Sequence, residues 1–170
     1  MPAQTSRLYR RLLLTGLSVA IATPRLYAQS ASGWAVGQIV TPPSLELLDG
    51  TSVDWLSLRG KVIVLEFWGS WCPFCARQNP LLDAFYREHR HLGLEAITIS
   101  LDKTKQAAQA YMAKGGYAFK AGMTTPAWDA IYRQRKGLPQ LFVLDRKSRL
   151  VMAEAREMLE EDIRDIAKYL

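Results

Sequence analysis

Residues 62–75 read VIVLEFWGSWCPFC, and this stretch decides the fold class of the chain. Its first seven residues form an almost unbroken run of β-branched and other apolar side chains. Such a run is typical of a central strand that is covered on both faces. Cys72 and Cys75, the only cysteines among the 170 residues, follow directly. A framework of structural disulfides would use more cysteines, spread further apart. The pair therefore indicates a reactive site rather than structural cross-links.

The sequence after this strand predicts a helix that begins at Cys72 or Pro73, because proline is tolerated in the first helical turn. Further apolar residues recur at helical spacing: Leu81, Leu82, Phe85 and Tyr86. The first turn of a helix leaves N–H groups unpaired and carries partial positive charge, and both stabilise a thiolate. We therefore expect Cys72, at the exposed end, to be the nucleophile in disulfide exchange and Cys75, one turn further, to be the resolving thiol.

A Cys-x-x-Cys pair has two other common uses. A structural zinc site needs four ligands, and the pair supplies two. The only histidines, His89 and His91, lie roughly 20 Å away at the far end of the same predicted helix. A structural short-range disulfide is the second alternative. We expect no metal and no cofactor.

The flanking segments alternate strand and helix, which favours an α/β domain with a central sheet. The expected strands cover residues 95–101, 140–145 and 150–153, and a short hairpin over residues 45–53 turns at Asp49-Gly50.

Helices are expected over residues 103–114, with Asp102 as the cap, and over residues 128–132. In the last segment four apolar residues share one helical face: Leu159, Ile163, Ile166 and Leu170.

The first 28 residues have the layout of a secretory signal peptide. Arginines precede an apolar stretch over residues 12–23, and Ala28 is one candidate cleavage position. An uncleaved membrane anchor is the alternative, although a span needs about 17–25 apolar residues. We assign residues 29–37 to a linker and residues 38–170 to the domain. Either form of the leader predicts a periplasmic or other extracytoplasmic domain, where disulfides persist.

The net charge of +6 comes mostly from this leader, which holds four arginines and no acidic residue. The rest of the chain has 18 basic and 16 acidic residues, so the body of the protein is nearly neutral. A nucleic-acid-binding protein would need a basic patch in its folded part. We therefore expect no nucleic-acid partner.

Residues 64–75 resemble the active-site segment of the thioredoxin superfamily. The leader, Gly60-Lys61 and Asn79-Pro80 resemble its TlpA/ResA branch of extracytoplasmic thioredoxins. The segment Gly137-Leu138-Pro139-Gln140 resembles the cis-proline loop of that family. The resemblance covers residues 38–170. It implies a thioredoxin-like fold, with a mixed β-sheet flanked by helices, an N-terminal β-hairpin and a modest insertion before the cis-proline strand.

Glu66 falls where the family places a buried acid beneath the cysteines. A carboxylate inside an apolar strand should be desolvated, which raises its pKa. A carboxyl with a raised pKa can shuttle a proton for Cys75. The alternative is a solvated glutamate at the edge of the sheet.

The resemblance also assigns a substrate-binding surface around the cysteines. Pro139 would be a cis-proline opposite Cys72, with an ordinary trans turn proline as the alternative. Leu138 would offer backbone groups to a bound substrate strand, although the family often has a smaller or β-branched residue there. Trp71, Pro73 and Phe74 are expected near the thiols, where they can contact partner proteins.

The motif leaves the direction of electron flow open, because the reduction potential decides it. Pro73-Phe74 lacks the histidine of the strongly oxidising DsbA type, and the space before Pro139 is too short for the DsbA helical domain. We therefore favour a monomeric reductase of partner-protein disulfides that takes electrons from a membrane donor. The branch suggests apocytochrome c or copper-site assembly proteins as substrates. A thiol oxidase or isomerase, and a copper-binding module, are the alternatives.

Overall fold

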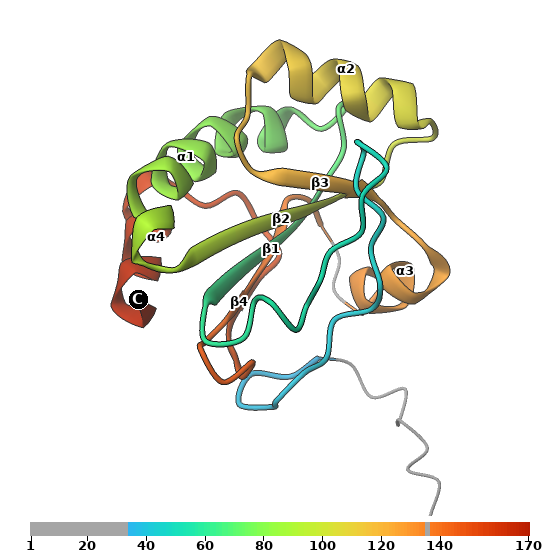
Figure 1. Ribbon diagram of the computed structural model, residues 1–170. Coiled ribbons are helices and arrows are strands. Elements are labelled where there is room, and N and C mark those ends of the chain that lie inside the picture. The colour runs from blue at the N-terminus through green and yellow to red at the C-terminus, as the bar shows by residue number, and fades with distance from the viewer. Residues whose placement is uncertain (1–33, 135–136) are drawn as a thin grey trace, which may run out of the picture. The chain divides into compact units, whose positions relative to one another are not determined.

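The computed structural model describes residues 34–134 and 137–170, and a five-stranded mixed sheet lies at its centre (Figure 1). The strands lie in the order β3-β2-β1-β4-β5. Their bounds are Val62–Trp68 (β1), Leu94–Ser100 (β2), Lys120–Met123 (β3), Gln140–Leu144 (β4) and Leu150–Glu154 (β5). β1 is parallel to β2 and antiparallel to β4. The predicted α/β class and mixed sheet are confirmed, whereas the expected signal peptide lies outside the described residues.

Helices cover both faces of this sheet. Their bounds are Pro73–His89 (α1), Lys105–Gly115 (α2), Pro126–Tyr132 (α3) and Glu160–Arg164 (α4), with short 3₁₀ turns at Arg90–Leu92 (η1) and Asp165–Tyr169 (η2).

The side chains of β1 alternate between the two faces, as the pleat of a strand requires. Ile63, Leu65 and Phe67 pack in the cluster that contains the α3 residues Trp128 and Ile131. On the other face, Val62 and Val64 pack with residues of α1 and α4. Every residue of β1 is buried, so the expectation of a strand covered on both sides is confirmed.

Strand β3 was not predicted from the sequence. Its four residues, KAGM, include a glycine and have weak strand propensity, and they are held by parallel pairing with β2. On its other side Gly122 forms a bridge to Leu47 in the N-terminal hairpin. A Cβ atom at Gly122 would lie 2.4 Å from the carbonyl oxygen of Glu46, so only glycine allows this close approach.

The hairpin itself turns at Asp49-Gly50 as expected. The N–H of Leu47 donates to the carbonyl of Thr51 at 2.7 Å, and the Asp49 carboxylate accepts from the Thr51 N–H at 2.9 Å. Residues 34–37, which the sequence analysis assigns to a linker, also pack on the domain. The Trp34 ring lies 5.6 Å from the ring of Phe142.

Two local predictions are wrong. Thr104, not Asp102, caps α2, because its hydroxyl accepts from the N–H of Ala107 while Asp102 bonds elsewhere. Leu159 does not share the buried face of Ile163 and Ile166. It is 56 % exposed because it lies before the first turn of α4.

Candidate active site

Cys72 is the N-cap residue of α1, at the point where the chain leaves β1. Its Sγ accepts a hydrogen bond from the backbone N–H of Cys75 at 3.2 Å. The residue is only 3 % exposed, so the expectation of an exposed thiol is wrong. The side chain is turned back onto the helix terminus and forms part of the wall of a groove, together with residues far away in the sequence.

This groove is lined by Trp71, Cys72, Pro73, Phe74, Tyr132, Gly137 and Leu138. Trp71 is 65 % exposed and Phe74 is 49 % exposed, which is unusual for such large apolar side chains. The peptide bond between Leu138 and Pro139 is cis, as the resemblance implied, so the trans alternative is wrong. The structure therefore brings four of the five residues expected to bind substrate to one apolar opening beside Cys72, and the fifth, Pro139, directly follows Leu138 in the chain.

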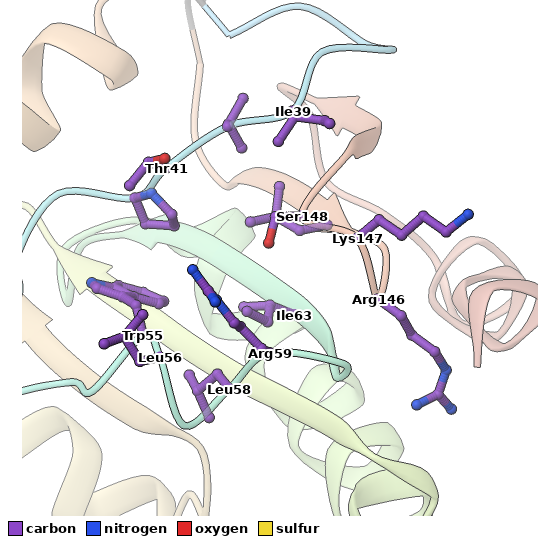
Figure 2. A pocket seen from close by; sticks show the side chains of 13 residues that line it. Ile39, Thr41, Trp55, Leu56, Leu58, Arg59, Ile63, Arg146, Lys147 and Ser148 are labelled. Carbon is purple, nitrogen blue, oxygen red and sulfur yellow. The ribbon is translucent and has the colours of Figure 1, made fainter.

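A second pocket, of about 370 Å³, lies at the opposite end of β1 (Figure 2). The buried side chains of Leu58, Ile63 and Leu144 line it, and Arg59 reaches over its opening. Because Cys72 follows the other end of β1, this pocket is separate from the thiols.

Cys75 lies one turn into α1 and is completely buried. Burial raises the pKa of its thiol well above the ordinary value, and the hydrogen bond with Cys72 and the charge of Glu66 act in the same direction. The Cys75 thiol is therefore protonated in the resting protein. It needs a base before it can attack a disulfide.

Glu66 lies on β1 and is also completely buried, so the alternative of a solvated edge residue is wrong. Burial raises its pKa to about 8, although a hydrogen bond from Gln78 partly opposes this shift. The Gln78 Nε2 atom donates to Glu66 Oε1 at 2.8 Å. Glu66 is thus a carboxyl that gains and loses a proton near neutral pH, beside a thiol that must lose one.

Asp102, two residues after the end of β2, holds the turn that leads to Cys72. The Asp102 carboxylate accepts from the Ser70 hydroxyl at 2.7 Å and from the Ser70 N–H at 3.2 Å. It also accepts from the Ser100 hydroxyl at 2.8 Å. Asp102 therefore anchors the turn between β1 and α1, which explains why it does not cap α2.

The sequence model of the Redoxin family matches residues 35–170. The chain belongs to the Redoxin family. It is also similar to proteins named thiol-disulfide oxidoreductase ResA. The one from Geobacillus thermodenitrificans is 26 % identical over 169 residues, covering 93 % of this chain and 92 % of that protein. The one from Halalkalibacterium halodurans is 33 % identical over 75 residues, covering 44 % of this chain and 43 % of that protein.

A solved structure shows the same fold as this Redoxin domain. It is a thiol:disulfide interchange protein of the thioredoxin family from Chlorobium tepidum TLS. The TM-score is 0.69 at 23 % identity, covering 79 % of this chain and 97 % of that one. The predicted thioredoxin-like, TlpA/ResA-like family and fold are confirmed. With its Cys-x-x-Cys pair at positions 72 and 75, this Redoxin protein is a thiol-disulfide oxidoreductase.

Sequence reasoning missed three residues of this Redoxin site. Gln78 and Asn79 are fully buried polar residues on α1 that face Glu66, and their spacing of three and four from Cys75 could have placed them beneath that thiol. Tyr132, which the sequence places only at the end of a predicted helix, lines the groove. It reaches the groove through the packing of α3, for which the sequence has no local signal.

In the part of the chain that the structure describes, no three His, Cys, Asp or Glu residues are grouped so that they could hold a metal ion. The helices of the same part are all too short or too polar to cross a membrane.

Proposed function

We propose that this protein reduces disulfides of partner proteins outside the cytoplasm, with Cys72 as the nucleophile, Cys75 as the resolving thiol and Glu66 as the proton acceptor. The observation that carries the proposal is the burial of Cys75 beside Glu66, directly behind Cys72 at the edge of an apolar groove. Cys72 faces the partner protein, and Cys75 lies beside Glu66, which can accept its proton.

The reaction has two exchange steps. In the first, the Cys72 thiolate attacks a partner disulfide, forms a mixed disulfide and releases one partner thiolate, which takes a proton from water. In the second, Cys75 gives its proton to the Glu66 carboxylate and attacks the Cys72 sulfur. The Cys72–Cys75 disulfide forms, and the second partner thiolate leaves and is protonated. Two electrons pass from the protein to the partner.

The two residues between the cysteines support the reducing direction. Strong oxidants stabilise their reduced, thiolate form. Pro73 and Phe74 bring neither a histidine nor a cation into the motif. The residues between the cysteines thus add no side chain that would stabilise the thiolate, which favours giving electrons away.

Substrate binding is assigned to the groove. Trp71, Pro73, Phe74 and Leu138 supply apolar contact area, and the backbone next to Pro139 pairs with a partner strand. The substrates are proteins with cysteine pairs, and the ResA resemblance suggests apocytochrome c or copper-site assembly proteins.

A signal peptide over residues 1–28 or a retained anchor places the domain, residues 38–170, in the periplasm or an equivalent compartment. There a monomer is re-reduced by a membrane electron donor.

The reduction potential of the Cys72–Cys75 pair tests the direction. It is measured by titration in a redox buffer, with tryptophan fluorescence as the readout. A value near or below about −220 mV supports a reductase. A value near about −120 mV makes the protein a disulfide donor and overturns the proposed direction.

A further inference from the structure

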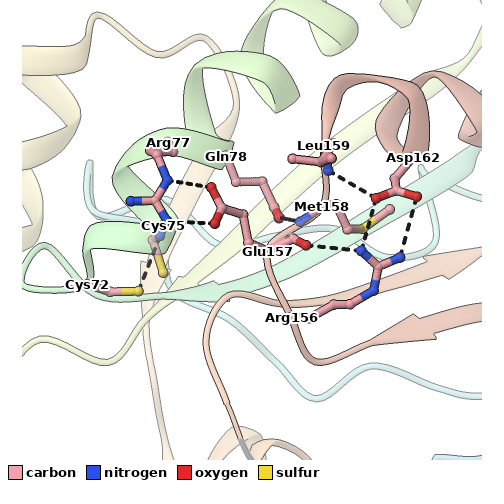
Figure 3. A network of polar contacts seen from close by, with 9 residues as sticks. All are labelled: Cys72, Cys75, Arg77, Gln78, Arg156, Glu157, Met158, Leu159 and Asp162. Carbon is pink, nitrogen blue, oxygen red and sulfur yellow. Dashed lines mark hydrogen bonds and ion pairs between the residues drawn. The ribbon is translucent and has the colours of Figure 1, made fainter.

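Gln78 is a buried amide whose two ends are both engaged. Its Oε1 accepts from the backbone N–H of Met158 at 2.6 Å (Figure 3), and its Nε2 donates to Glu66 Oε1 at 2.8 Å. The residue is completely buried. Because the Met158 N–H can only donate, the carbonyl end of the amide must face Met158. The NH₂ end is thereby obliged to face Glu66.

Asn79, the next residue of α1, approaches the same carboxylate oxygen. In the amide orientation that satisfies its neighbours, Nδ2 donates to Glu66 Oε1 at 3.2 Å and to the Cys75 carbonyl at 3.0 Å. Its Oδ1 then accepts from the Tyr111 hydroxyl at 3.2 Å. Two N–H donors thus meet Oε1. An oxygen that faces two donors cannot itself carry a proton without losing one of these bonds.

We infer that Gln78 is a positioning residue, which occupies Oε1 of Glu66 and so makes Oε2 the oxygen that exchanges a proton with Cys75. The inference rests on the proposed function, in which Glu66 exchanges a proton with Cys75. It adds the residue that orients the Glu66 carboxyl for this exchange. Gln78 itself touches neither the partner nor the reacting sulfur atoms in this scheme. It acts through Glu66.

The segment between β5 and α4 holds Gln78 in this position (Figure 3). The Arg77 guanidinium forms two contacts of 2.6 Å with the Glu157 carboxylate, so consecutive residues of α1 bind consecutive residues of this segment. The segment is braced internally, because the Asp162 carboxylate accepts from Arg156 and from the Leu159 N–H, each at 3.0 Å. The hydrogen bond from Met158, 80 residues further along the chain, therefore decides that the NH₂ end of the Gln78 amide faces Glu66.

This arrangement predicts a direction for the proton affinity of Glu66. The titratable groups that face Glu66 among the described residues are Cys75 on α1 and Tyr111 on α2, and both have raised pKa values and are neutral at pH 7. With no facing charge, the amide donors are what stabilises the carboxylate form against burial. Loss of the Gln78 donor must therefore raise the pKa of Glu66 further.

The test replaces Gln78 by leucine, which has a similar size and no donor. The pKa of Glu66 is followed by ¹³C NMR of labelled glutamate and assigned by comparison with Glu66→Gln. We expect an upward shift of about one to two units, because a hydrogen bond to a charged group is lost. Release of the second partner thiol should slow about tenfold or more at pH 7. In a plot of this release rate against pH, the rise in rate should move to higher pH.

Gln78→Glu is the second variant, which keeps an acceptor for the Met158 N–H in case leucine impairs folding. It places a second carboxyl against Glu66, so the pKa of the pair should also rise. Arg164→Ala is the control, because it removes an exposed ion pair with Glu160 on α4 without touching Glu66, its amide donors or the segment that holds Gln78. It should leave both the pKa and the pH profile unchanged.

The inference is overturned if folded Gln78→Leu keeps the wild-type pKa of Glu66, or if Arg164→Ala shifts that pKa equally. Failure of the proposed function looks different. In that case Glu66→Gln would have normal turnover at every pH, while the NMR titration would still report whether Gln78 sets the proton affinity of Glu66.

Discussion

The two sides of the cysteine pair are built from opposite kinds of side chain. On the outer side, Cys72 opens onto a groove of exposed apolar residues, including Trp71 and Phe74. On the inner side, Cys75 lies against buried polar groups, including Glu66 and Gln78. An ordinary domain has the reverse pattern, with apolar groups inside and polar groups outside. Both departures from that rule occur around the cysteine pair, where β1 ends and α1 begins.

The difference separates two tasks that one pair of thiols must perform. The outer side must bind many partner sequences, and exposed aromatic surface suits that task because its contacts are non-directional. The inner side must move one proton at a fixed place, which requires directional hydrogen bonds in a dry environment. Substitutions on the two sides should therefore affect different measurable steps.

The largest expected effect comes from removing either thiol. Cys72→Ser should reduce insulin disulfides no faster than the dithiol reagent alone, because no attack can begin. Cys75→Ser should attack but not resolve, so it should accumulate mixed disulfides with partner proteins that survive denaturing gels without reductant. Full activity of Cys72→Ser would show that the outer side is not where exchange starts.

Glu66→Gln should act on the second step alone. Loss of a positioned proton acceptor costs about 10²-fold in such reactions. Stopped-flow measurements should show normal formation of the mixed disulfide and slow release of the second thiol, without the wild-type rise in rate as the pH approaches about 8. Equal slowing of both steps would mean that the two sides are not separate.

The same substitution should stabilise the fold at alkaline pH. The folded protein keeps the proton of Glu66 up to about pH 8, whereas the unfolded chain loses it near 4.5. The folded state therefore binds more protons between these values, and the free energy of unfolding falls as the pH rises through this window. Glu66→Gln removes this loss. The free energy of unfolding of this variant, measured by urea denaturation, should exceed that of the wild-type protein by roughly 3–5 kcal/mol at pH 8.5, and by much less at pH 5.

On the outer side, Trp71→Ala and Phe74→Ala should lower kcat/KM for a protein disulfide by about tenfold each. They should leave the reduction of a small aromatic disulfide nearly unchanged, because that substrate does not span the groove. Leu92→Ala is the matched control, since Leu92 is 48 % exposed and does not line this groove. A similar loss in the control, or an equal loss with the small disulfide, would contradict a partner-binding role.

The two sides also differ in how far the sequence predicts them. Strand β1, the helix after it and the Cys-x-x-Cys pair are local patterns, and the sequence places them correctly. Glu66 is also visible, because a carboxyl in an apolar run is conspicuous. The groove beside Cys72 also includes Tyr132 and Leu138, which are brought in by tertiary packing. The contact between Gln78 and Met158 joins residues 80 positions apart, and no local pattern can encode it.

The smallest expected effect lies in the turn that joins the two sides. Ser70→Ala removes the 2.7 Å hydrogen bond to Asp102 but keeps the bond from the Ser70 N–H. One side-chain hydrogen bond contributes about 1 kcal/mol, so urea denaturation should show a loss of that size. Because the backbone anchor remains, the position of Cys72 should persist and the rate of insulin reduction should change less than threefold. A large loss of activity with normal stability would mean that the Ser70 hydroxyl, and not the backbone of the turn, sets the geometry of the nucleophile.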